Sequence, residues 1–294
     1  MTILEVKDLS KNYGRIRAVN SLNLEVNKGQ VYGILGPNGS GKTTTLGMVL
    51  GIIRPDRGNF TWFRDQNINN PLNKVGALLE TPNFYPYLHA DGNLAIVRHI
   101  KRSAETNFDR ILELVHLKRR RTSKFRTYSL GMKQRLAIAS ALIGDPEVLI
   151  FDEPTNGLDP EGIADVRNII VRIAEMGKTI IMASHILAEV EKVCSHVAIL
   201  KEGQLLASGH IGAILSDDKI IEIRAPDMDK VRQLVISFKG FKFLSENTGY
   251  LLIGITGNHT AGDLNQFLFS NGIVLDHLQE KRATLEEEFL EIVK

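Results

Sequence analysis

The segment from Gly36 to Thr43 constrains the fold of this chain more than any other. It reads Gly-Pro-Asn-Gly-Ser-Gly-Lys-Thr and fits the pattern G-x-x-x-x-G-K-[ST]. The apolar run 31–35 precedes it as an expected buried strand, and the helix-forming stretch 44–50 follows it. Glycines let the backbone curl until several N–H groups point at one set of phosphate oxygens, and the helix adds its positive N-terminal end. The segment therefore predicts a loop that binds the phosphates of a nucleotide.

Two side chains of this loop have specific expected roles. Lys42 is expected to reach the β- and γ-phosphates, and the Thr43 hydroxyl is expected to ligate Mg²⁺. The residues expected to contact the nucleotide are Gly36, Pro37, Asn38, Gly39, Ser40, Gly41, Lys42, Thr43 and Thr44. The structural alternative is a glycine-rich turn that only joins a strand to a helix.

Composition narrows the class of protein. The chain has 294 residues, of which 43% are hydrophobic and 24% charged, so it has room for one large and one small globular domain. Its 36 basic and 34 acidic side chains nearly balance, which does not favour a nucleic-acid partner. The single cysteine, Cys194, rules out an internal disulfide framework and suits a reducing cytosol. We find no signal peptide and no apolar stretch of about 20 residues, so we expect no membrane span.

Strand and helix patterns alternate along most of the chain. Apolar strands are expected at 148–151, 179–183 and 197–200, with helices at 162–175 and 186–193 between them. This order predicts a mainly parallel sheet covered on both faces. Residues 80–145 interrupt it with a helical insertion, in which helices are expected at 93–102, 108–117 and 130–143. Further strands are expected at 3–7, 20–26, 59–63 and 75–79.

The pattern changes after residue 217. The expected elements there are strands at 219–224, 241–244, 250–255 and 273–278 and helices at 228–238, 260–271 and 285–293. We therefore predict two domains, 1–217 and 218–294, and find no catalytic motif in the second.

Two carboxylates follow one of the expected buried strands. Asp152 and Glu153 come directly after the apolar run 148–151. Ligands of open α/β sheets bind at the carboxyl ends of the strands, so Asp152 is expected to hold Mg²⁺ or its water. Glu153 is expected to accept a proton from an attacking water. The alternative is a strand that ends in a polar turn.

Two further polar residues stand at helix starts. Asp159 precedes Pro160 and has the pattern of a helix N-cap, which is the favoured interpretation from sequence alone. His185 follows the strand 179–183 and is more often a capping or packing residue in such a place. Beside a phosphate loop it could instead donate a hydrogen bond to the γ-phosphate.

The segment from Arg126 to Arg135 decides between these alternatives. Ser129-Leu130-Gly131-Met132-Lys133-Gln134 resembles the signature sequence in the ATP-binding subunits of ABC transporters, and the resemblance covers about residues 1–215. Asp152 and Glu153 lie at the family's usual distance downstream. In this resemblance Asp159 matches the D-loop, His185 matches the switch histidine, and Tyr13 matches the aromatic residue that stacks on adenine.

The resemblance implies a fold, an activity and partners. The fold is α/β: a phosphate-loop ATPase domain with a mainly parallel sheet, an antiparallel β subdomain and a helical insertion, plus a small C-terminal α+β domain. The activity is ATP hydrolysis with Mg²⁺, with Glu153 and His185 as catalytic residues. Two copies would form a head-to-tail dimer in which Ser129 and Gly131 of one chain meet the nucleotide of the other. The dimer would act at the cytoplasmic side of the cell membrane, bound to an integral membrane permease subunit.

Three residues depart from the family pattern and are typical of one branch of the family. Leu130 replaces the first signature glycine, Met132 replaces a glutamine, and Glu80 stands where most members have glutamine. Glu80 could ligate Mg²⁺ directly. These residues and the closing segment 283–290 resemble bacitracin-type and lantibiotic-type peptide antibiotic exporters, although the direction of transport cannot be read from this chain.

Two surfaces remain to be assigned. The run 118–121 is basic and lacks interleaved aromatic residues, which favours a solvated helix end over a nucleic-acid site. Phe84, Tyr85 and Tyr87 are expected to be exposed and to meet a helix of the membrane partner, with ordinary anchoring of a loop as the alternative.

The rival functions are an ABC-type ATPase acting on ribosomes or nucleic acid, and a regulatory module that binds nucleotide without hydrolysing it.

Overall fold

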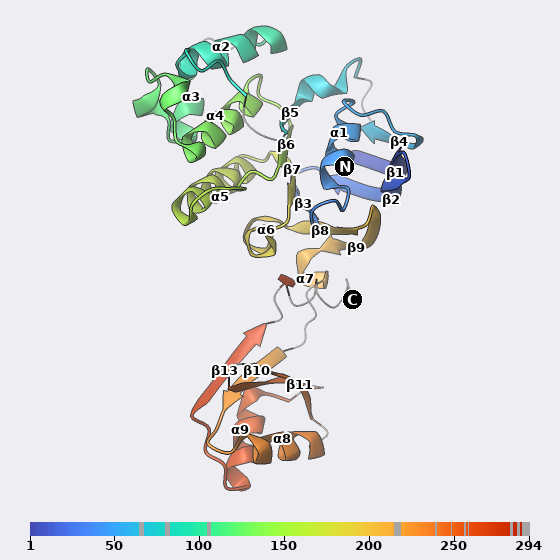
Figure 1. Cartoon of the computed structure of the whole chain (residues 1–294), viewed down its shortest axis with the longest axis vertical. Helices are drawn as coiled ribbons and strands as arrows, with labels where there is room; N and C mark the ends of the chain where they lie inside the picture. The colour runs from blue at the N-terminus through green and yellow to red at the C-terminus, as the bar shows by residue number, and fades with distance from the viewer. Residues whose placement is uncertain are drawn as a thin grey trace. The chain divides into compact units, whose positions relative to one another are not determined.

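The computed structural model describes residues 1–64, 68–79, 83–104, 107–214, 219–238, 240–247, 249–255, 257, 259–282, 285–286 and 289. The chain divides into two compact units, Met1–Ile211 and a second that begins at Gly212 (Figure 1). The domain boundary predicted after residue 217 falls among residues 215–218, which lie outside the described part of the chain.

A six-stranded sheet forms the centre of the first unit. Its strands follow the order β5-β6-β7-β3-β8-β9, and all are parallel except β9, which pairs antiparallel with β8. The bounds are β3 Val31–Leu35, β5 Val75–Leu78, β6 Val148–Asp152, β7 Thr179–Ser184, β8 His196–Lys201 and β9 Gln204–His210. Every residue of β3, β6 and β7 is buried, which explains their continuous apolar runs. The mainly parallel sheet is thus confirmed. Strand β9, whose residues are exposed and half-buried in turn, lacks a continuous apolar run and was not predicted.

A second, antiparallel sheet has the order β2-β1-β4. Its strands are β1 Thr2–Tyr13, β2 Ile16–Asn27 and β4 Arg57–Trp62. The first two are longer than predicted because they form a hairpin that turns at Gly14, whose φ is +59°. Helix α1, Lys42–Val49, shares one buried apolar cluster with this sheet and with the central sheet.

The predicted helical insertion lies between β5 and β6. It contains α2 Ala90–Lys101, α3 Asp109–Leu114 and α4 Leu130–Leu142, with 3₁₀ turns at Lys118–Arg120 and Phe125–Thr127. Figure 1 shows these three helices together beside the β5 end of the sheet. The first unit also contains α5 Pro160–Glu175, α6 Leu187–Val193 and a 3₁₀ turn at Pro71–Lys74, and the short α7, Ile211–Ile214, begins where this unit ends.

The second unit is a split β-α-β-β-α-β arrangement. Its order along the chain is β10 Lys219–Arg224, α8 Met228–Ser237, β11 Phe241–Asn247, β12 Tyr250–Ile255, α9 Ala261–Ser270 and β13 His277–Arg282. The strands pair antiparallel in the order β11-β12-β10-β13, which is the ferredoxin-like topology. The two helices bury their apolar residues against the sheet in a separate core.

One strand of this unit was predicted wrongly. The apolar run 273–278 was expected to be the last strand, but β13 is His277–Arg282. Ile273 is buried and its backbone N–H donates to the carbonyl of Leu268, so the start of this run closes helix α9 instead of entering the sheet. Most of the closing helix expected at 285–293 lies outside the described residues.

The hydrogen bonds around His196, at the start of β8, favour the neutral form of its ring. The amide of Gln30 accepts from the backbone of Asn27, so its N–H group faces His196 Nε2 at 3.0 Å. His196 Nε2 therefore accepts, and Nδ1 donates to Ser195 Oγ at 3.0 Å. Burial, and then repulsion from the opposed His210, lowers the pKa of His196 below the ordinary value of 6.5. The folded chain thus favours the neutral ring.

We expect this histidine to make the fold less stable in acid. The unfolded chain takes up a proton as the pH falls through the ordinary histidine range, whereas folded His196 resists it, so stability is kept above that range and lost below it. Thermal unfolding at about pH 7.5 and about pH 5.5 should show a smaller acid shift for His196→Asn than for the parent chain. His99→Asn, at an exposed position in the last turn of α2, is the control. Equal acid shifts in the parent and His196→Asn would contradict the prediction.

Candidate functional site: a nucleotide site at the carboxyl edge of the central sheet

Three neighbouring parallel strands bring the predicted site residues to one edge. Strand β7 lies between β3 and β6, with Leu35 paired to Ser184 and Asp152 paired to Ala183. The phosphate loop follows β3, His185 follows β7, and Glu153 follows β6. Because parallel strands end on the same side, residues from three distant segments of the chain meet here.

The backbone of the phosphate loop requires glycine at two positions. Gly36 has a φ of +154°, and a Cβ built on it would lie 2.3 Å from the carbonyl oxygen of Leu200. Gly41, the N-cap of α1, has a φ of +103°, and its Cβ would lie 2.3 Å from the carbonyl oxygen of Ala18. The loop is therefore pressed against two strands and can curl only without side chains at these positions.

Ser40 supplies a buried polar atom inside this loop. Its side chain is buried, and among the described residues its Oγ has no hydrogen-bond partner. Buried polar groups are nearly always hydrogen-bonded, so an unsatisfied hydroxyl in this place fits a loop that receives oxygen atoms of a ligand.

Lys42 folds back over the loop. Its side chain is 5% exposed, and Nζ donates to the carbonyl oxygens of Gly36 at 2.7 Å and Pro37 at 3.2 Å. The same Nζ lies 3.5 Å from Glu153 Oε1. The next two residues of the helix, Thr43 and Thr44, are exposed and half-buried. The first turn of α1 thus carries a buried cation and an accessible hydroxyl, which is a suitable set of groups for phosphate and metal.

Glu153 is held from two sides. Besides the ion pair with Lys42, its Oε2 lies 2.8 Å from Nδ1 of His185 and accepts a hydrogen bond from the backbone N–H of His185 at 3.3 Å. Its φ is +48°, a left-handed conformation that is uncommon for a residue with a side chain and is typical of functional turns. Asp152 is 4% exposed at the end of β6. The sequence motifs predicted that these residues lie at the carboxyl edge of the sheet. They did not predict the ion pair between Lys42 and Glu153.

Ser129 and Asp159, the two predicted site residues that begin helices α4 and α5, lie together at a second place. Ser129 is the N-cap of α4, and its Oγ accepts from the backbone N–H of Met132 at 3.3 Å. Asp159 is the N-cap of α5, and its Oδ1 accepts from Gly162 at 2.9 Å. The two helix starts line a cavity of about 430 Å³. Its walls are Ser129, Leu130, Gly131, Arg135, Gly157, Leu158, Asp159, Glu161, Gly162 and Asp165.

The cavity has two features that the sequence did not predict. The Arg135 guanidinium lies 3.4 Å from Asp165, so a cation of α4 faces an anion of α5 across the wall. Leu130 is 46% exposed, and a Cβ on Gly157 would lie 3.4 Å from its Cδ2. Thus the Leu130 side chain lies beside the loop that leads to Asp159.

Other predicted residues have the following places. Tyr13 ends β1, is 49% exposed, and has the Lys11 ammonium 5.7 Å from its ring centre. Glu80, predicted as a metal ligand, lies outside the described residues. Cys194 is buried, as expected, and burial raises the pKa of its thiol.

Comparison with known proteins identifies the family. Residues 19–156 match the family described as ABC transporter. The bacitracin transport ATP-binding protein BcrA of Bacillus licheniformis is 37% identical over 298 residues, which cover 99% of this chain and 97% of the relative. This chain is an ABC transporter ATP-binding subunit. The ABC subunit is also 37% identical over 204 residues to the lantibiotic transport ATP-binding protein SrtF of Streptococcus pyogenes, covering 69% of the subunit and 89% of the relative.

Solved structures agree with the fold and the activity. A dimeric post-hydrolysis state of an ATP-binding cassette, bound to ADP and Pi, covers 71% of the ABC subunit at 25% identity with a TM-score of 0.62. The α/β cassette fold is thus confirmed, and the subunit is an ATPase that binds ATP. Within the described residues, no helix combines the length and the apolar character that a membrane span requires.

Proposed function

We propose that this ABC subunit drives the transport of a peptide antibiotic or a similar drug-like compound, most simply its export, through a separate membrane subunit. The observation that carries the proposal is the match along nearly the whole chain to a protein named for bacitracin transport, supported by a second relative named for lantibiotic transport. The match includes the second unit, since it covers 99% of the chain.

The proposed working form is a head-to-tail dimer. The phosphate loop and Glu153 lie at the carboxyl edge of the sheet, whereas Ser129 and Asp159 line a cavity formed by other residues. That cavity has two helix N-termini, whose N–H groups and positive ends attract phosphate. A second copy turned head to tail would place this cavity opposite the phosphate loop and complete two sites at once. A solved cassette with ADP and Pi is a dimer, which supports the arrangement.

The residues at the sheet edge fit a magnesium nucleotide. Mg²⁺ is usually held by one or two protein oxygens together with phosphates and waters, and Thr43 and Asp152 provide a hydroxyl and a carboxylate. Glu80 remains a proposed third ligand. When bound, Mg²⁺ would neutralise charge on the phosphates. The loop from Gly36 to Thr44 would bind the phosphates, and Tyr13 would stack on the adenine.

Glu153 is the proposed general base. The Glu153 carboxylate lies 3.5 Å from Nζ of Lys42, the residue proposed to hold the γ-phosphate. A water that attacks this phosphate would therefore be within reach of the carboxylate. His185 donates its backbone N–H to Glu153 and keeps the carboxylate oriented. The opposing Ser129 and Gly131 would stabilise charge on the phosphoryl oxygens.

The aromatic segment before α2 is the proposed docking surface for the membrane subunit. Tyr85 and Tyr87 are 49% and 64% exposed, and their rings lie 5.9 Å apart. Phe84, which was also predicted to be exposed, is half-buried instead because its ring packs edge-on against Phe125 at 5.2 Å. Phe84 therefore anchors the loop, as the alternative interpretation expected, while the two tyrosines beside it stay exposed and carry the docking proposal.

Fractionation of membranes tests this proposal. Tagged subunit expressed in its own host should be extracted from the membrane fraction together with an integral membrane subunit. The double variant Tyr85→Ser and Tyr87→Ser should lose most of this association, because two large apolar contacts disappear. Ile100→Ser removes an apolar side chain that is 74% exposed at the other end of α2, and it is the matched control. Recovery of the subunit on ribosomes or nucleic acid, with no membrane protein, would overturn the proposal.

A further inference from the structure

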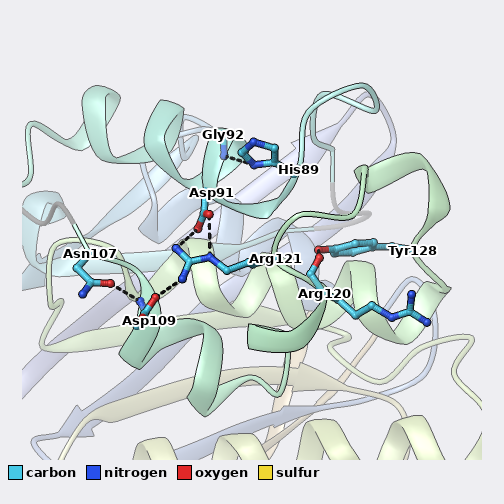
Figure 2. A network of polar contacts seen from close by, with 8 residues as sticks. All are labelled: His89, Asp91, Gly92, Asn107, Asp109, Arg120, Arg121 and Tyr128. Atoms are coloured by element: carbon cyan, nitrogen blue, oxygen red, sulfur yellow. Dashed lines mark hydrogen bonds and ion pairs between the residues drawn. The ribbon is translucent and has the colours of Figure 1, made fainter.

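Arg121 lies between two aspartates that begin two different helices. Its Nε and Nη2 donate to the Asp91 carboxylate at 2.9 and 3.0 Å, and its Nη1 donates to Asp109 (Figure 2). Asp91 is in the first turn of α2, and Asp109 is the first residue of α3. One guanidinium therefore joins both helices, through a bidentate pair on one side and a single pair on the other.

The same residue holds the loop that leads into α4. The carbonyl oxygen of Arg121 accepts from the backbone N–H of Ala90 at 3.1 Å. Further along, the backbone N–H of Phe125 donates to Leu88 at 2.8 Å, and the hydroxyl of Tyr128 donates to the carbonyl of Arg120 at 2.8 Å. The loop 118–128 is thus bonded to the start of α2 and to the segment before it through Arg121 and Phe125, while Tyr128, directly before Ser129, bonds back to Arg120.

Arg121 differs from the other residues of the basic run 118–121, which was predicted to be a solvated helix end. Lys118, Arg119 and Arg120 are exposed, and Lys118 makes only a surface pair with Glu113 at 3.2 Å. Arg121 is half-buried instead and pairs with Asp91 and Asp109. Without the guanidinium, two carboxylates would face each other across the start of both helices, and like charges this close repel.

We propose that Arg121 is a positioning residue that sets the place of the α4 N-terminus, where Ser129 and Gly131 meet the nucleotide of the second copy. This inference rests on the proposed function of the dimer. Arg121 lies away from the phosphate loop of its own chain in sequence and in its contacts, so its loss should leave nucleotide binding by the single chain intact. It should instead weaken the step in which α4 of one chain meets the ATP of the other.

The test measures these two steps separately in a Glu153→Gln background, where hydrolysis is blocked. Nucleotide affinity is measured on dilute single chains, and ATP-driven dimerisation is measured by sedimentation. Arg121→Gln should keep the affinity and weaken dimerisation by roughly tenfold, the scale of one charge-assisted hydrogen bond. Arg121→Lys keeps the positive charge but loses the planar guanidinium that pairs through two N–H groups. Its dimerisation should be weaker than that of the parent and stronger than that of Arg121→Gln. Arg119→Gln removes an exposed charge from the same turn and should behave as the parent.

Each outcome has a definite meaning. Arg121→Gln that dimerises as readily as Arg119→Gln overturns the inference, and so does an equal loss of affinity and dimerisation. If Arg121→Gln does not fold, Asp109→Asn takes its place, because it keeps the bidentate pair between Arg121 and Asp91. This variant should weaken dimerisation less than the loss of Arg121 would. Unchanged dimerisation by Asp109→Asn would then reject the inference. A parent that fails to dimerise with ATP refutes the proposed dimer itself, irrespective of Arg121.

Discussion

Replacing Glu153 with glutamine should abolish most ATP hydrolysis and leave ATP binding intact. Glutamine keeps the size of the side chain and can still receive the backbone N–H of His185, but it cannot accept a proton from water. The loss of a general base lowers the rate by about 10²- to 10⁴-fold. Because ATP would bind and stay, the variant should accumulate as a dimer in the presence of ATP. Steady-state phosphate release and sedimentation with ATP measure the two effects.

A control substitution tests whether the loss of any carboxylate charge, and not only that of Glu153, slows ATP hydrolysis. Glu175→Gln removes an exposed carboxylate from the last residue of α5, far along the helix from the site, and should turn over ATP at the parental rate. Near-parental hydrolysis by Glu153→Gln would show that Glu153 is not the base. A trapped dimer would in addition support the head-to-tail arrangement, because a site complete within one chain has no reason to hold two together.

Replacing Lys42 with alanine should weaken ATP binding by about 10- to 100-fold, the scale of one or two charge-assisted hydrogen bonds. Lys42 is almost fully buried and is the cation that lies between the loop carbonyls and Glu153. Its removal leaves the carboxylate facing the place where phosphates are expected, so repulsion adds to the lost attraction. Titration with a fluorescent ATP analogue measures the dissociation constant directly.

The control for this variant is Lys28→Ala. The Lys28 side chain is 56% exposed and lies 3.9 Å from Glu147, so its loss removes a surface cation of the same type. Its affinity for ATP should match that of the parent. Unchanged binding by Lys42→Ala would contradict the phosphate role of the whole loop.

The sequence predicted the elements that depend on short, strong patterns. Strands β3, β6 and β7 were found because buried parallel strands give continuous apolar runs, and the glycine pattern of the phosphate loop follows from a backbone that excludes side chains. The N-cap Asp159 was likewise found from local chemistry, since a carboxylate before a proline that starts a helix can accept from the free N–H groups of the first turn.

The features that were missed depend on contacts between distant segments. Nothing near Arg121 in the sequence indicates that Asp91 and Asp109 will flank it. Phe84 was taken as exposed because its partner, Phe125, is far along the chain. The apolar residues from Ile273 were taken as a strand because hydrophobicity alone does not distinguish a strand from a helix end that packs into the core.

Strand β7 also sets a width. Because it separates β3 from β6, the phosphate loop and Asp152 start two strand spacings apart, which is about 10 Å. Side chains span this separation: Lys42, from the phosphate-loop side, has its Nζ 3.5 Å from the carboxylate of Glu153, the residue after Asp152. With the strands adjacent, the two backbones would start about 5 Å apart, and with a second strand between them about 14 Å apart. Strand β7 therefore sets the distance that the side chains proposed to act on the phosphates must span.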